Sequence, residues 1–188
     1  MTADGGATLA RVMSSELHLP ELLAPLGLEL RRGPAASGFL QALERFHRAG
    51  GSRASLGRMA DAAGDPFERS RWQGWSQAYQ RFWRGRELQP FSPLSGRLDF
   101  DGGGLFLEPD LGLEVDGTPY SLYVHLGSAS LLGEPARLIC QAFSEGLDLD
   151  GGVRVAVLDL PRNLWLEPQV PSPDAAERLR ALWREVVA

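Results

Sequence analysis

Residues 109–126 read PDLGLEVDGTPYSLYVHL, two runs of alternating apolar residues separated by Asp116 and Gly117. Asp-Gly between two alternating runs is a strong signal for a β-hairpin with a two-residue turn. Counting outward from the turn pairs Val115 with Thr118. This register is favoured because a shift by one residue would scatter the apolar side chains over both faces of the sheet. In it, one face holds Leu111, Leu113, Val115, Tyr120, Leu122, Val124 and Leu126.

The opposite face of the predicted hairpin is polar. The register places Asp110 opposite Tyr123 and Glu108 opposite His125, so that all four side chains lie within cross-strand contact. Two carboxylates beside a histidine are suited to metal binding or to acid–base chemistry. The alternative is a hydrogen-bonded polar patch on a sheet that carries no chemistry.

Helical patterns precede this hairpin. We expect helices around residues 7–17, from Pro20 to residue 26, from 39 to about 49, from 52 to 63 and from 65 to 85. The last of these has the clearest start, because Asp65-Pro66-Phe67-Glu68 combines an N-cap carboxylate, proline at the first helical position and glutamate at the third. One aromatic stripe follows at helical spacing, formed by Trp72, Trp75, Tyr79, Phe82 and Trp83.

Strand patterns dominate after the Pro/Ser-rich segment 89–96. Residues 98–100, 105–115, 118–126 and 153–160 are expected to be strands, and the nearly continuous apolar run of the last one favours a strand that is covered on both faces. Residues 134–146 and 172–186 are expected to be helices. The sequence therefore predicts an α+β fold in one compact domain over 1–188. Its mainly helical part (1–88) packs on a small mixed sheet with a crossover helix (96–188).

Composition narrows the class of protein. The chain has 44% hydrophobic and 23% charged residues, which are ordinary globular values. Its single cysteine, Cys140, lies in an apolar run, so no disulfide framework or cysteine-based zinc site forms within one chain, and we expect the thiol to be buried. No signal peptide and no run of about 20 apolar residues is evident. These features favour a cytoplasmic protein that does not enter a membrane.

Charge is divided unevenly along the chain. Every basic residue other than histidine is arginine, and residues 31–97 contain 12 Arg against 5 Asp and Glu, a net charge of +7. Residues 98–188 contain 6 Arg against 15 Asp and Glu, a net charge of −9.

The guanidinium group binds phosphate well because its planar fork donates two hydrogen bonds and stays charged. The arginines predicted to bind nucleic acid are Arg53, Arg58, Arg69, Arg71, Arg81 and Arg84. In the alternative interpretation, the arginines of the basic half pair with the acidic half within the fold.

The predicted order of elements resembles the core of the PD-(D/E)XK (restriction-endonuclease-like) nuclease superfamily over roughly residues 75–160. That order is a helix, a three-stranded meander, a crossover helix and a fourth strand. Pro109-Asp110 stands at the position of the family's Pro-Asp element, and Tyr123-Val124-His125 stands at that of its acid-x-lysine element. In that family the two acids hold a divalent metal and the lysine orients and activates water. Here only Asp110 matches by residue type.

This departure shapes the functional expectation. Tyrosine is a poor ligand for Mg²⁺, and neutral histidine does not replace the charge of lysine. We therefore expect a nucleic-acid-binding or accessory protein with a nuclease-like but inactive fold and no cofactor. One alternative is an interaction module whose oppositely charged faces engage a protein partner or a second copy. A third hypothesis is a metal-dependent nuclease in which Glu108 acts as a migrated acid, Asp110 and Glu108 hold Mg²⁺, and His125 is the base.

Overall fold

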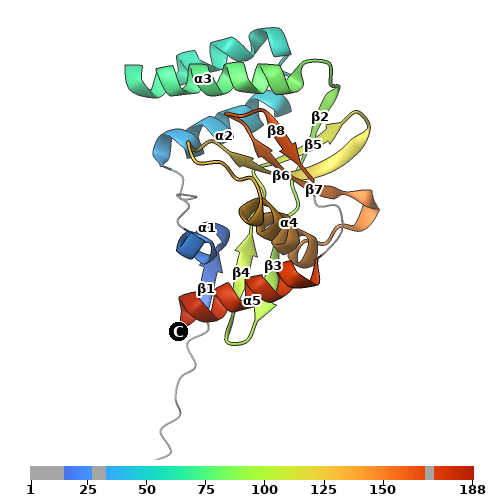
Figure 1. Ribbon diagram of the computed structural model, residues 1–188. Coiled ribbons are helices and arrows are strands. Elements are labelled where there is room, and N and C mark those ends of the chain that lie inside the picture. Colours follow the sequence, from blue (N-terminus) through green and yellow to red (C-terminus); the bar gives the residue numbers. More distant parts are fainter. Residues whose placement is uncertain (1–14, 27–32, 168–171) are drawn as a thin grey trace, which may run out of the picture.

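The computed structural model describes residues 15–26, 33–167 and 172–188 (Figure 1). A five-stranded mixed sheet in the order β2-β5-β6-β7-β8 lies at its centre. Only β6 and β7 run parallel to each other; the other neighbours are antiparallel. The strands are β2 (Leu88–Phe91), β5 (Leu111–Val115), β6 (Thr118–His125), β7 (Arg154–Asp159) and β8 (Leu164–Leu166).

Helices cover both faces of this sheet (Figure 1). On one face, α2 (Pro34–Arg48), the 3₁₀ helix η2 (Arg53–Ala62) and α3 (Pro66–Trp83) form an apolar core with side chains such as Leu113 and Leu122. On the other face, α4 (Glu134–Gly146) and α5 (Pro173–Val187) pack with Val155, Val157 and Tyr123. Alternate residues of β7 thus enter opposite cores, which confirms the prediction of a strand covered on both faces.

A second sheet packs with the α4 and α5 side. Its three strands, in the order β1-β4-β3, are β1 (Ser15–His18), β4 (Gly103–Leu107) and β3 (Gly96–Phe100), with β1 parallel and β3 antiparallel to β4. The short helices α1 (Leu19–Leu22) and η1 (Ala24–Leu26) follow β1. At Gly96 a Cβ atom would collide with the carbonyl oxygen of Gly146, so glycine permits β3 to approach the end of α4 closely.

The hairpin has the predicted register. Val115 pairs with Thr118, Leu113 with Tyr120 and Leu111 with Leu122. At the turn, Asp116 and Gly117 have φ values of 51° and 81°, and this left-handed conformation is what a two-residue hairpin turn requires.

The best-defined helices begin where the sequence predicts. The Asp65 side chain accepts a hydrogen bond from the Glu68 amide at 2.8 Å, and the Glu68 carboxylate accepts one from the Gly64 amide at 2.9 Å. At the start of α5, Ser172 Oγ accepts from the Ala175 amide at 3.4 Å. Trp72, Trp75, Tyr79 and Phe82 are buried, which confirms the aromatic stripe. Cys140 is also buried, as expected.

Several boundaries differ from the prediction. The predicted helix 7–17 is wrong at its end, because residues 15–17 belong to β1; residues 7–14 lie outside the described part. The predicted strand 105–115 is two strands, since β4 ends at Leu107 in one sheet and β5 begins at Leu111 in the other. Residues 52–63 are helical as predicted but form a 3₁₀ helix, and α2 begins at Pro34, earlier than expected. The edge strands β2 and β8 were not predicted.

Helices and mixed sheets together confirm the α+β class. In the part of the chain that the structure describes, no helix has the length and apolar character needed to cross a membrane.

Candidate functional site

The four polar residues of the hairpin prediction have separate environments. Glu108 lies in the connection between the two sheets and not in the hairpin ladder, so its predicted pairing with His125 is wrong. Its side chain is exposed, with Oε2 3.9 Å from His18 Nδ1. The predicted pairing fails because β4, which ends just before Glu108, belongs to the other sheet and pairs with β1 and β3.

Asp110 fastens the start of β5 to β6. Its amide donates to the Leu122 carbonyl oxygen at 2.7 Å, and its Oδ2 accepts a hydrogen bond from the Val124 amide at 2.6 Å. The carboxylate therefore satisfies a backbone donor of the central strand, just beyond the last pair of the hairpin ladder.

Tyr123 and His125 are both buried, each 4% exposed. The Tyr123 ring lies in the α4 core, with its centre 6.4 Å from the centre of Phe143. His125 Nε2 lies 2.7 Å from the carbonyl oxygen of Ala129, in the loop that follows β6. Within the described residues, no three or more His, Cys, Asp and Glu side chains come together in a group that could hold a metal ion.

Asp110→Ala should lower the free energy of unfolding by about 1 to 3 kcal/mol, because the buried Val124 amide would lose its acceptor. Urea unfolding measures this effect. Glu108→Ala is the matched control, since that carboxylate is exposed, and should change stability by less than about 0.5 kcal/mol. Equal stability of Asp110→Ala and the wild type would refute the fastening role of Asp110.

Sequence reasoning missed an ion pair beside His125, formed by a buried aspartate and a partly exposed arginine. Asp159 is the register partner of His125 in the parallel β6–β7 pair and is fully buried. Its Oδ1 lies 2.9 Å from Arg162 Nη1. The Leu131 amide also donates to Asp159 at 3.3 Å. Arg162 in turn donates to the carbonyl oxygens of Gly127 and Ser128. The pair thereby holds the loop after β6 against the turn after β7. The sequence signal that could have indicated this pair is Asp159 itself, an acidic residue near the carboxyl end of the apolar run 153–160.

All six arginines predicted to bind nucleic acid are exposed on η2 or on α3 and its C-terminal end. None of them forms an ion pair with another described residue. The ion pairs of the described residues involve other arginines, for example Arg48 with Glu44 on α2 and Arg178 on α5 with Glu134 on α4. The hypothesis that these six arginines pair with the acidic half is therefore wrong for the described residues. Their charge faces solvent.

Three of these arginines meet in one groove of about 730 Å³ between η2 and α3, which we call the arginine groove. Gln80 Nε2 donates to the backbone oxygen of Arg53 at 3.2 Å and so links the two helices beneath it. The groove is lined by Ser52, Arg53, Ala54, Gln77, Gln80, Arg81 and Arg84.

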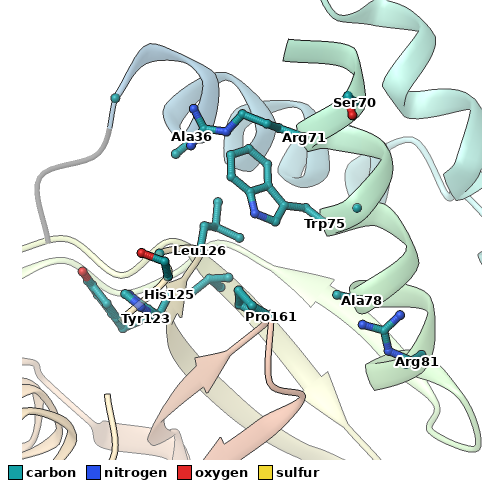
Figure 2. A pocket seen from close by; sticks show the side chains of 15 residues that line it. Ala36, Ser70, Arg71, Trp75, Ala78, Arg81, Tyr123, His125, Leu126 and Pro161 are labelled. Atoms are coloured by element: carbon teal, nitrogen blue, oxygen red, sulfur yellow. The ribbon is translucent and has the colours of Figure 1, made fainter. Parts of the chain in front are cut away.

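A second cavity of about 640 Å³ lies between α3 and the carboxyl end of β6; we call it the strand-end pocket (Figure 2). Figure 2 shows Arg71 and Arg81 toward opposite ends of the α3 side, with His125 and Pro161 on the strand side. Arg81 lines both cavities, and Arg71 lines only this one. Arg58 and Arg69 are exposed but line neither. Tyr123 and His125 both line this pocket, so the structure brings these two predicted residues together.

Comparisons of the chain with protein-family models, with curated proteins and with solved structures gave no significant match.

Proposed function

We propose that this protein binds nucleic acid through the phosphate backbone and acts as an accessory protein with a nuclease-like but non-catalytic core. The observation that carries the proposal is the arginine groove, where Arg53, Arg81 and Arg84 meet without an ion-pair partner among the described residues.

The chemistry of the groove suits phosphate. Three guanidinium groups each offer a planar fork of donors that stays charged at any physiological pH. The amides of Gln77 and Gln80 add neutral polar groups to the same lining. The whole chain has a net charge of −5, so attraction for a polyanion must come from a local concentration of basic residues rather than from overall charge.

Binding without cleavage fits the chemistry of the hairpin. If the core is related to the PD-(D/E)XK nucleases, Tyr123 and His125 occupy the positions of the second acid and the lysine, although the strands of the predicted meander are divided between two sheets. Tyr123 packs beside Phe143 in the α4 core, and Asp110 binds a backbone amide. The proposed activity needs no cofactor; Mg²⁺ would be required only by an active nuclease.

The direct test is binding of a fluorescently labelled oligonucleotide at low salt. Replacing Arg53, Arg81 and Arg84 together by glutamine should weaken binding by about 100-fold or more, because several charge-assisted hydrogen bonds are lost. Arg178→Gln is the matched control, since Arg178 is bound to Glu134 on the α4–α5 side; it should bind like the wild type. If the wild type binds neither DNA nor RNA, or if the triple variant binds equally well, the proposal fails.

A second candidate function is a protein-interaction module with oppositely charged faces. The acidic charge belongs to residues 98–188 as a whole, which have a net charge of −9, because α5 itself contains three arginines and three acids. A second copy could bind through contacts between the arginines of α3 and exposed acids of this half such as Asp148 and Asp150. Light scattering at low and high salt tests this: a dimer or larger species that dissociates as salt rises supports it, and a monomer at low salt refutes self-association.

A further inference from the structure

One face of α3 carries a stack of alternating aromatic and cationic side chains. The Arg71 guanidinium carbon lies 5.8 Å from the centre of the Phe67 ring and 4.9 Å from that of Trp75. Residues 67, 71 and 75 are four apart and therefore follow one another along the same side of the helix. We call these three side chains the α3 stack.

Phe67 is unusual because its large apolar side chain is 74% exposed. The core does not require it, and the ring presents a free face to solvent. Trp75 is 8% exposed and lines the strand-end pocket together with Arg71. The α3 stack thus runs from an exposed ring down to the wall of the cavity.

The strand-end pocket has room and charge for an anionic group of nucleotide size. Its volume of about 640 Å³ is within the usual range of small-ligand sites. Two arginines line it, and no Asp or Glu is among the described lining residues. Gly74 and Ala78 keep the α3 side open; a Cβ atom at Gly74 would meet nothing within 4 Å.

We infer that the strand-end pocket and the α3 stack receive an unpaired nucleotide of a single-stranded nucleic acid. This inference rests on the proposed function. The base stacks on the exposed Phe67 ring, and phosphates of the same strand contact Arg71 and Arg81. Stacking needs the flat face of a base, which a duplex keeps covered by its neighbours, whereas an unpaired strand exposes it.

Arg81 connects this site to the arginine groove, because it lines both cavities. A strand whose base stacks on Phe67, with its phosphate in the strand-end pocket, therefore continues along α3 onto Arg53 and Arg84. The groove accounts for binding to any phosphate backbone, and the α3 stack accounts for a preference for unpaired strands.

Phe67→Ala separates the two contributions. It should weaken binding to an oligothymidine of about 15 nucleotides by roughly 10-fold, within the range seen for residues that stack on bases. Binding to a duplex should not change. Leu132→Ala is the matched control, because Leu132 is the other large apolar side chain exposed in the described part (56%) and lines neither cavity. The RNA strand of equivalent sequence shows whether the sugar matters.

The outcomes are distinct. If the duplex binds as tightly as the single strand and Phe67→Ala changes neither, the inference is overturned while the proposed function stands. If no nucleic acid binds at low salt, both fail. A 2-aminopurine placed in the strand adds a readout of stacking itself, because its fluorescence falls when it stacks. The wild type should quench it on binding, and Phe67→Ala should quench it less at saturating protein.

Discussion

Replacing Arg162 with methionine should lower the free energy of unfolding by about 2 to 4 kcal/mol, toward the lower end of the range for buried pairs because the Arg162 side chain is 30% exposed. Arg162 is the cationic partner of Asp159, which is completely buried at the carboxyl end of β7. Methionine keeps an apolar side chain of similar length but leaves the carboxylate without a compensating charge. It also removes the hydrogen bonds from the guanidinium to Gly127 and Ser128, which line the strand-end pocket.

Urea unfolding with an unchanged m value measures this loss. Arg154→Met is the control, because the 3.9 Å pair of Arg154 with Glu167 is half exposed and should contribute less than about 1 kcal/mol. Combining Arg162→Met with Asp159→Asn should recover part of the loss, since the buried charge is then also gone. If the unfolding free energy of the Arg162→Met variant lies within about 1 kcal/mol of the wild-type value, this account of the pair is contradicted.

Stability should also fall with acidity because of His47. Burial lowers the pKa of His47 from 6.5 to about 4, and its Nε2 lies 2.7 Å from the Tyr79 hydroxyl. Well above pH 6.5 the imidazole is neutral in both the folded and the unfolded state, so it adds no pH dependence there. Between about pH 6.5 and pH 4, His47 binds a proton in the unfolded state but stays neutral in the folded state. Stability is therefore lost as the pH falls from about 6.5 to about 4, by roughly 3 kcal/mol at about 1.4 kcal/mol per pH unit.

His47→Gln isolates this effect, because glutamine retains polar atoms near Tyr79 but does not titrate. Other groups titrate in the same range in both proteins, so the quantity to follow is the difference in unfolding free energy between wild type and variant. That difference should shift by roughly 3 kcal/mol against the wild type between pH 7 and pH 4. Parallel pH profiles for the two proteins would show that His47 is not buried in its neutral form.

Local signals were sufficient for much of the fold. The Asp116-Gly117 turn and the apolar alternation determined the hairpin register, and Asp65 with Glu68 determined where α3 begins. Each is a short-range effect: the turn residues adopt the left-handed conformation that a hairpin requires, and the cap residue accepts from a nearby amide. The nearly continuous apolar run of β7 was a local signal as well, and it indicated a strand covered on both faces.

Long-range pairing could not be predicted from the sequence. β1 has four residues and lies at the edge of its sheet, where its partner is β4, about ninety residues later. Pro90 made segment 88–91 look like a linker, yet proline is tolerated because β2 is an edge strand. The split between β4 and β5 moved Glu108 away from the hairpin for the same reason: the two strands have different partners.

The candidate site divides similarly. The six arginines predicted to bind nucleic acid were chosen from the charge pattern alone; all six are exposed, and their binding stays a prediction. The meeting of Arg53, Arg81 and Arg84 in one groove depends on how η2 packs against α3, which no local pattern specifies. The strand-end pocket depends on the approach of α3 to the end of β6, and the Asp159–Arg162 pair on a turn that the sequence marks only weakly.

The central claim is that Arg53, Arg81 and Arg84 bind phosphates, and the salt dependence of oligonucleotide binding tests it most directly. Each neutralised phosphate contributes about 0.7 to the slope of log affinity against log salt for a single strand. The wild type should therefore lose affinity steeply as salt rises, and the triple glutamine variant should show a slope shallower by about 2, with Arg178→Gln unchanged. A wild type that does not bind at low salt, or a triple variant with the wild-type slope, would contradict it.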